Sequence, residues 1–98
     1  MKIENLPEKY REDIKKATYL LKNAGSSNVY LFGSMVTGKI HDNSDIDIGI
    51  KGLPPEEFFK VYSKLYMNFN NEIDLIDFDD DDDMFLLLER LGEVVEVG

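Results

Sequence analysis

The sequence contains no cysteine, which excludes disulfide bonds, a thiol nucleophile and a thiolate metal site. Basic residues are also few, since 11 Lys and Arg stand against 20 Asp and Glu and give a net charge of −9. A free-standing nucleic-acid-binding protein normally carries the opposite sign, because it must neutralise phosphates. The acidic balance favours a basic protein partner or cation-bridged ligands, or it serves solubility alone. We therefore expect no direct binding of nucleic acid.

Long apolar runs and targeting signals are absent as well. No apolar run approaches the ~20 residues of a membrane span, and Met1–Asn5 does not resemble a signal peptide. We expect a soluble, cytoplasmic protein with no membrane association. The length of 98 residues, of which 43% are hydrophobic, predicts a single domain over residues 1–98 with a thin core.

Hydrophobic periodicity predicts helices that alternate with strands. Apolar residues recur at helical spacing between Pro7 and Gly25, and again from 56 to 69, and a short helical stretch is predicted over 34–38. Short apolar runs predict strands over 28–32, 44–51, 72–77 and, at the end, 93–97. A last helix is predicted over 84–91, with Asp83 as its cap and Gly92 at its end. This order predicts an α/β or α+β domain with a mixed sheet of three to four strands flanked by helices.

The segment Ser44–Ile50 alternates strictly between acidic and isoleucine residues before its glycine. In a strand, its three isoleucines lie on one face, and Asp45 and Asp47 lie on the other, roughly 6–7 Å apart at Cα. Two carboxylates about 4 Å apart repel by on the order of 4 kcal/mol at an effective dielectric constant near 20. A strand that tolerates such repulsion indicates a bound cation. The alternative is the exposed face of an edge strand.

A third acidic residue, Asp74, lies in the apolar strand predicted over 72–77, which has little other reason to carry a charge. Asp77 lies on the opposite face of that strand and is interpreted as structural, whereas Glu72 shares the face of Asp74 but sits at the strand's start. Carboxylate oxygens without cysteine or paired histidines suit Mg²⁺ or Mn²⁺ rather than Zn²⁺. The predicted ligands are Asp45, Asp47 and Asp74.

Gly33 and Ser34 follow the first predicted strand and form either a simple turn or a phosphate cradle. Lys39 and Lys51 flank the predicted site, where each either meets phosphate oxygens or is a solvated charge. His41 is the sole histidine and is predicted to be a surface residue.

Two further segments bear on partners. The acidic run Asp79–Asp83 is interpreted mainly as a solvated, poorly ordered loop, with a docking patch for a basic partner as the alternative. The run Met84–Leu88 at the start of the last predicted helix is apolar on all sides, so we expect part of residues 84–91 to meet another chain, in a homo- or hetero-oligomer. Three tyrosines are assigned to core or helix-face packing: Tyr30, Tyr62 and Tyr66.

Gly33-Ser34, ten intervening residues and Asp45-x-Asp47 together resemble the signature of the polymerase-β-like nucleotidyltransferase superfamily. The chain is most like its smallest branch, the minimal nucleotidyltransferases encoded beside HEPN-domain toxins. The resemblance implies that Gly33 and Ser34 bind the triphosphate of ATP, and Lys39, which flanks the turn, is the further residue predicted to bind it. It also implies that Asp45, Asp47 and Asp74 are catalytic and hold two Mg²⁺ ions, with Mn²⁺ as an alternative.

The implied activity is transfer of a nucleoside monophosphate, AMP from ATP, to a hydroxyl of a HEPN ribonuclease toxin, with tyrosine as the expected acceptor. The chain would thus act as an antitoxin. Minimal members often carry arginines directly after Gly-Ser, but this chain has Met35-Val36-Thr37 there. Either nucleotide affinity is weak, or Lys39 or the partner compensates. Two alternatives stay open: an antitoxin that acts by binding alone, and a nucleotidyltransferase for a small molecule.

Overall fold

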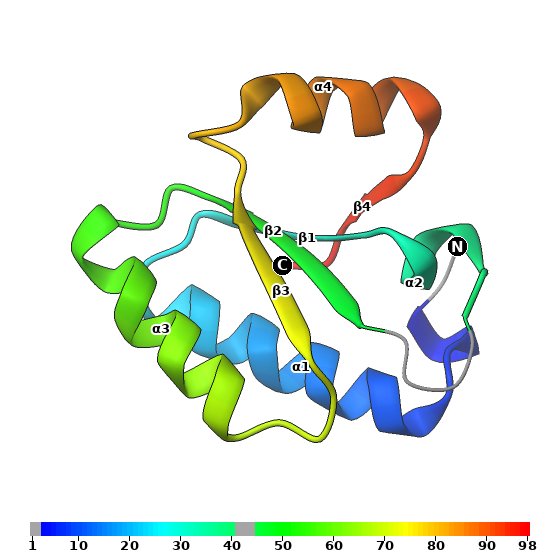
Figure 1. Ribbon diagram of the computed structural model, residues 1–98, viewed down its shortest axis with the longest axis horizontal. Helices are drawn as coiled ribbons and strands as arrows, with labels where there is room; N and C mark the ends of the chain where they lie inside the picture. Colours follow the sequence, from blue (N-terminus) through cyan, green and yellow to red (C-terminus); the bar gives the residue numbers. More distant parts are fainter. Residues whose placement is uncertain (1–2, 41–44) are drawn as a thin grey trace.

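The computed structural model describes residues 3–40 and 45–98, so His41 and Ser44 lie outside the described residues. After a 3-10 turn at Ile3–Asn5, the elements follow the predicted order (Figure 1). They are α1 (Glu8–Asn23), β1 (Asn28–Phe32), α2 (Ser34–Thr37), β2 (Ile46–Lys51), α3 (Pro55–Met67), β3 (Ile73–Asp77), α4 (Asp82–Leu91) and β4 (Val94–Glu96). Within the described residues, no helix has the length and apolar character needed to cross a membrane.

The four strands form one sheet in the order β3-β2-β1-β4, which confirms the predicted mixed sheet of three to four strands. β1 runs antiparallel to both β2 and β4, whereas β2 and β3 are parallel. Parallel neighbours need a crossover connection, and α3 supplies it. Because β2 and β3 run the same way, residues at the start of both strands lie side by side.

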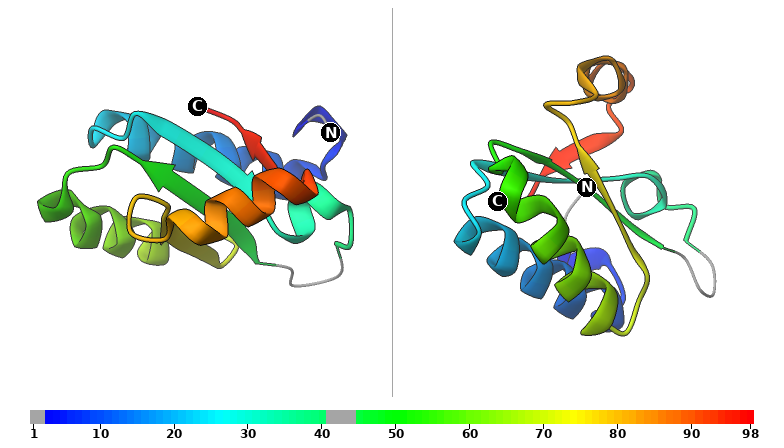
Figure 2. Two further views of the ribbon diagram at one scale, coloured as in Figure 1. Left: turned by 90° about the horizontal axis from the view of Figure 1, so that it is seen from above. Right: turned by 60° about the vertical axis from the view of Figure 1, so that its left-hand side comes forward.

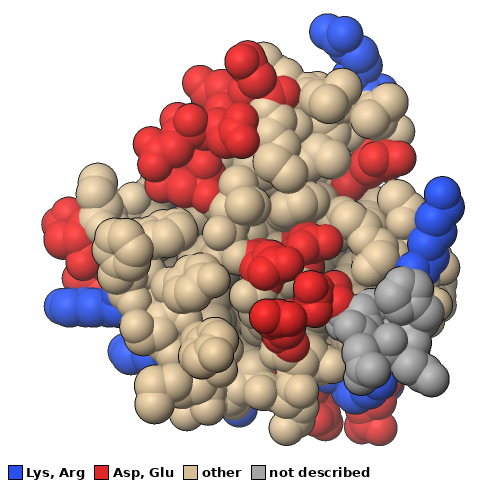
Figure 3. Space-filling view, viewed as in Figure 1, with Lys and Arg blue, Asp and Glu red and all other residues tan. Residues whose placement is uncertain are grey.

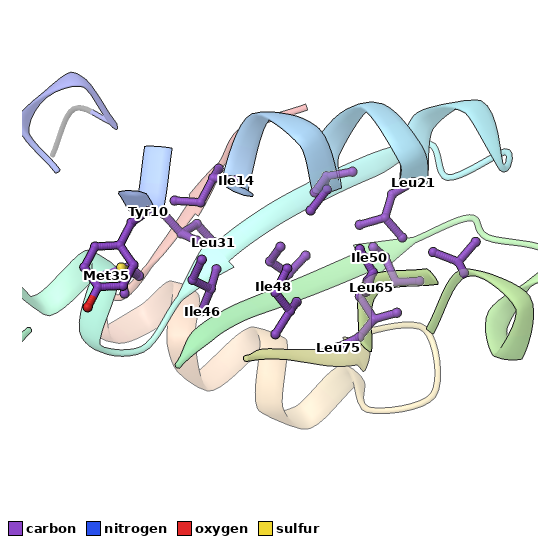
Figure 4. Close-up of a cluster of buried hydrophobic side chains, with 14 of the residues drawn as sticks. Tyr10, Ile14, Leu21, Leu31, Met35, Ile46, Ile48, Ile50, Leu65 and Leu75 are labelled. Carbon is purple, nitrogen blue, oxygen red and sulfur yellow. The ribbon is translucent and has the colours of Figure 1, made fainter. Parts of the chain in front are cut away.

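Helices α1 and α3 cover one face of the sheet and enclose the main core (Figures 1 and 2). The three isoleucines of β2 are completely buried there, and Figure 4 shows them beside α1. Burial of each such side chain contributes about 1.5–3 kcal/mol. A slip of one residue would bring Asp45 and Asp47 into this core, so the isoleucines fix the strand register and turn both carboxylates to the opposite face.

Helix α4 packs on that opposite face through a second, aromatic cluster centred on Phe32, Phe78 and Phe85. The ring of Phe78 lies 5.5 Å from that of Phe32 and 5.1 Å from that of Phe85, centroid to centroid. Gly49 makes room for this packing, because a Cβ at position 49 would overlap the Phe78 ring. The cluster covers the part of the face near the end of β2, and Asp74, near the start of β3, stays exposed.

The acidic run is ordered, which corrects the prediction of a poorly ordered loop. Asp81, not Asp83, caps α4, since its Oδ1 accepts a hydrogen bond from the Met84 amide at 3.2 Å. Asp79 Oδ2 accepts one from the Gly52 amide at 2.7 Å and so ties the run to the end of β2. Asp82 and Asp83 lie in the first turn of the helix, where the macrodipole favours negative charge.

Two of the tyrosines assigned to packing lie at the surface. Tyr66 is 76% exposed and Tyr62 is 39% exposed, whereas Val61 and Leu65 of the same helix are buried. Tyr30 packs as predicted, with its ring 5.0 Å from the ring of Phe85, and Tyr62 also stacks on the ring of Phe58, at 6.2 Å between centroids. The outer leucines of α4, Leu86 and Leu87, are more than half exposed, as expected for a helix that is apolar on all sides.

Candidate active site

Four carboxylates gather where β2 and β3 begin. Asp47 and Asp74 are direct partners in the parallel register, on the face of the sheet that also carries α4. Asp45 lies just before β2 and Glu72 just before β3, where the Ile46 amide donates to the Glu72 carbonyl at 2.9 Å. Figure 3 shows acidic side chains gathered over β2 and β3. The structure thus brings together the three predicted acids and adds Glu72 as a fourth.

The carboxylates of this cluster perturb one another. The pKa of Asp47 is raised to about 6, first by burial, then by the charges of Asp74 and Asp45, and by a hydrogen bond with Asp74. The pKa of Glu72 is also raised, mainly by the charge of Asp45 and a hydrogen bond with it. In the part of the chain that the structure describes, no Lys or Arg pairs with any of the four. The cluster therefore carries uncompensated negative charge at neutral pH.

The Gly33–Ser34 turn lies against this cluster. Phe32 is the cross-strand partner of Asp47, so the chain that leaves β1 passes directly beside the Asp47 carboxylate. Gly33 adopts φ +72° and ψ −145°, and a Cβ there would overlap Asp47 Oδ2. Ser34 is half-buried and begins α2, a helix of four residues that ends at Gly38. The predicted phosphate-binding turn and the predicted metal ligands are therefore neighbours in space.

The predicted basic residues differ in their placement. Lys39 is exposed and follows the end of α2, on the side of the turn. Lys51 is not available to a phosphate at the cluster, which corrects that expectation: its Nζ lies 3.5 Å from the centroid of the Phe85 ring, under α4. The side chain of Met35 is apolar and buried in the main core, so the side chain after Ser34 offers no polar group to a ligand.

The donor set of the cluster fits a hard divalent cation, because carboxylate oxygens are the ligands that Mg²⁺ and Mn²⁺ prefer. Among the described residues, however, no three carboxylates already converge into a formed metal site. Instead the raised pKa of Asp47 lets this carboxyl group hold a proton below about pH 6, which reduces the repulsion that a cation would otherwise offset. The assignment of the three acids as ligands stays a prediction.

A buried polar contact that the sequence did not predict holds the loop before the carboxylate cluster in place. Asp13 of α1 is buried, and its Oδ2 accepts hydrogen bonds from the amide of Asn71 at 3.0 Å and from Asn71 Nδ2 at 2.8 Å. Asn71 Nδ2 also donates to the Lys9 carbonyl at 3.0 Å. These bonds fix the loop directly before Glu72. The signal in the sequence is an acid on the apolar face of the helix, one residue before Ile14.

Comparison with known proteins agrees with this geometry. The family described as polymerase beta, nucleotidyltransferase, matches residues 12–93, which include every residue of the cluster and of the turn. None of the curated proteins matches the sequence.

Solved structures share the fold. A toxin–antitoxin crystal structure with AMP-PNP is 25% identical, with a TM-score of 0.64 over 92% of this chain and 72% of its own. A MntA–HepT toxin–antitoxin structure is 22% identical, with a TM-score of 0.60 over 88% and 69%. A complex of a tri-AMPylated Shewanella oneidensis HEPN toxin with an MNT antitoxin is 19% identical, with a TM-score of 0.51 over 84% and 83%. The match to the family spans most of the sequence, and the chain therefore belongs to the polymerase-β nucleotidyltransferase family.

Proposed function

We propose that this chain is a metal-dependent nucleotidyltransferase that transfers AMP from ATP to a tyrosine hydroxyl of a HEPN-domain toxin and thereby acts as its antitoxin. The observation that carries the proposal is the register of Asp47 with Asp74, beside the Gly33–Ser34 turn. Support comes also from neighbours of this fold, which include a toxin–antitoxin structure with AMP-PNP and an antitoxin bound to an AMPylated HEPN toxin.

In this proposal Asp45, Asp47 and Asp74 hold two Mg²⁺ ions, and Gly33, Ser34 and Lys39 hold the triphosphate. Bound divalent cations polarise phosphoryl oxygens and neutralise the charge that develops on them. The acceptor oxygen forms a bond to the α-phosphorus as the bond to the β-phosphate oxygen breaks, and pyrophosphate leaves. Asp74, the exposed member of the strand pair, takes the proton of the acceptor hydroxyl.

A protein acceptor is favoured by the open setting of the cluster. Asp74 and Glu72 are exposed, and Asp45 is half-exposed, so the described residues do not enclose a small molecule at these carboxylates. Another molecule must therefore hold the acceptor hydroxyl in place, and a bound protein does so at high effective concentration. The negative charge of this chain favours a basic protein in that role.

One observation favours a second candidate, an antitoxin that acts by binding alone. No basic residue lies between Ser34 and Lys39, and the apolar side chain of Met35 is buried in the main core. A triphosphate at the turn would then receive fewer charge-assisted hydrogen bonds than it would if arginines followed Ser34.

The experiment that separates the two incubates this chain with a HEPN-domain protein encoded beside its gene, with ATP and Mg²⁺, and weighs the HEPN protein by intact mass spectrometry. The proposal expects one or more added adenylates with the wild-type chain, none with Asp47→Asn, and wild-type transfer with Glu12→Gln, an exposed acid on α1. An unmodified HEPN protein whose ribonuclease activity is nonetheless suppressed would decide for binding alone.

A further inference from the structure

The outer flank of α3 carries exposed aromatic side chains. We define the α3 strip as Phe58, Phe59, Tyr62, Tyr66 and Met67. Phe59, Tyr66 and Met67 are each more than three-quarters exposed. The Phe58 ring lies 5.6 Å from the Phe59 ring and 6.2 Å from the Tyr62 ring, so the aromatic groups form one continuous surface. Exposed apolar surfaces of this kind mark interaction sites.

Hollows follow the strip along the whole length of α3. One of about 320 Å³ lies between Phe58, Phe59 and the acids Asp77 and Asp80. A second, of about 300 Å³, is lined by Tyr62, Tyr66 and Met67. A third, of about 220 Å³, lies between Tyr66 and Glu72. The strip therefore leads from the acidic run to the carboxylate cluster at the start of β3.

Both ends of the strip are negatively charged. Asp77 and Asp80 line the hollow at one end, and Glu72 lines the hollow at the other. Figure 3 shows uncharged surface over α3, with acidic side chains above it and on the side of the cluster. The lysines of the same helix, Lys60 and Lys64, line a different hollow, between α3 and α1. Lys16 also lies beside the third hollow, with its Nζ 5.2 Å from the centroid of the Phe69 ring. The carboxylate cluster adds further negative charge at that end, so the rim as a whole favours a positively charged occupant.

This combination of charge and apolar surface identifies the class of occupant. Nucleic acid would be repelled by the acids at both ends. A second copy would bring a charge of −9 against −9. A polypeptide segment whose apolar side chains alternate with Lys and Arg satisfies both the aromatic surface and the acidic rim.

We propose that the α3 strip is the docking surface for a basic amphipathic segment of the acceptor protein, which it places across the edge strand β3 and beside the carboxylate cluster. The identification of that protein as the acceptor rests on the function proposed above, whereas the chemistry of the surface does not. The strip is better placed for this than the outer leucines of α4, because it runs into the hollow that Glu72 lines.

The test uses two synthetic peptides that share one amphipathic pattern of leucine, one with lysine and one with glutamate at all its polar positions. Two-dimensional NMR of the full chain records which amide signals shift on titration. The proposal expects the lysine peptide to shift amides of α3 and of residues 70–74, and the glutamate peptide to shift none. Shifts confined to α4 would overturn the proposal, as would equal binding of both peptides.

Variants give a second readout. Phe59→Ser combined with Tyr66→Ser should weaken the lysine peptide at least tenfold, with no loss of fold because both side chains are exposed. Tyr19→Ser, a 70% exposed tyrosine on α1, and Leu87→Ser on α4 are matched controls that should bind like wild type. Weakening by Leu87→Ser but not by the α3 variant would overturn the proposal. So would concentration-dependent self-association that the α3 variant abolishes.

The transfer assay separates this inference from the proposed function. If the HEPN protein is adenylylated, the α3 variant should raise the KM for that protein severalfold and leave kcat unchanged. Transfer with an unchanged KM would overturn the docking surface and leave the proposed function standing. Peptide binding at α3 without any transfer would leave the surface standing and count against the function.

Discussion

Gly33 packs its α-carbon against the carboxylate of Asp47 so closely that any Cβ at position 33 would overlap Asp47 Oδ2. Its backbone, at φ +72° and ψ −145°, also lies in a region that is essentially reserved for glycine. Two independent constraints therefore require glycine at this position. They couple the turn after β1 to the acid on β2, so that a change in one must displace the other.

Replacement of Gly33 tests this coupling, with Gly38 as a matched control. Gly38 also has a positive φ, +81°, but a Cβ there would meet nothing within 4 Å. We expect Gly38→Ala to cost about 1 kcal/mol from its left-handed backbone. Gly33→Ala should cost about 1–3 kcal/mol from strain, with a further loss from the clash, and should abolish nucleotide binding. If urea unfolding shows that both variants lose the same free energy of unfolding, and Gly33→Ala still binds nucleotide, the contact with Asp47 is unimportant.

Divalent cations should stabilise the fold through the carboxylate cluster. A ligand that binds only the folded state raises the free energy of unfolding by RT ln(1 + [L]/Kd), or about 2.7 kcal/mol at a hundredfold excess over Kd. We expect millimolar Mg²⁺ or Mn²⁺ to raise the Tm measured by calorimetry. Asp47→Asn should remove most of that shift, and the metal-free variant should be as stable as wild type or more so. Equal shifts in both proteins would rule out a shared site.

The raised pKa of Asp47 predicts the pH dependence of the metal-free protein. Because the folded state holds this proton up to about pH 6 and the unfolded state releases it near 3.8, the folded state binds more protons in that window. The contribution of Asp47 to the free energy of unfolding is therefore fully present below pH 3.8 and is lost as pH rises through 6. Its size is about 1–2 kcal/mol once solvent screening of a half-exposed group is included.

We thus expect denaturant titrations without metal to show a component of stability that falls between pH 4 and 7. Asp47→Asn should remove this fall in the free energy of unfolding. The loss of stability at lower pH, which comes from other carboxylates, should stay. A wild-type component that rises with pH across this window, or one unaltered in the variant, would contradict the electrostatic account of the cluster.

Ser34→Ala should weaken binding of ATP with Mg²⁺ and leave the fold intact. A hydrogen bond from a hydroxyl to a charged oxygen contributes about 1.5–3 kcal/mol, which corresponds to roughly 10- to 150-fold in Kd. Ser63→Ala, an exposed serine on α3, is the matched control. Calorimetric titration measures both variants. Unchanged affinity in Ser34→Ala would mean that the turn has no role beyond connecting β1 to α2.

Much of the fold could be predicted because two periodicities are clean. The alternation of Ile46, Ile48 and Ile50 fixes both the strand and the face on which Asp45 and Asp47 lie, and the structure confirms this placement. The helical spacing of Tyr10 to Leu21 likewise predicts the buried face of α1, which the structure also confirms. In both cases a single face is buried, so hydrophobic pattern and packing agree.

The errors arise where spacing or composition allows two structures. Tyr62 and Tyr66 repeat at the same interval as the buried Val61 and Leu65, one residue later. Periodicity alone cannot show that β3 is an edge strand of the sheet. Because no further strand of the described residues pairs with the outer edge of β3, the flank of α3 that carries Tyr62 and Tyr66 stays uncovered. For the acidic run, composition predicts solvation, but it does not register that Asp81 and Asp79 can each satisfy a free backbone amide. These hydrogen bonds order the segment.

For the site, Asp-x-Asp and Gly-Ser were visible in the sequence, whereas the position of Glu72 beside Asp45 depends on the parallel pairing of β2 with β3. The support from Asp13 depends on a contact 58 residues away along the chain, which no local pattern encodes.

The central claim is that Asp45, Asp47 and Asp74 bind catalytic cations beside a triphosphate at Gly33–Ser34. Crystals grown with Mn²⁺ and a non-hydrolysable ATP analogue test it most directly, through anomalous diffraction at the manganese edge. The account predicts manganese bound by these three carboxylates, at about 2.0–2.3 Å, with the phosphates of the analogue against the Gly33–Ser34 turn. Manganese bound elsewhere, or an analogue bound away from the turn, would contradict it.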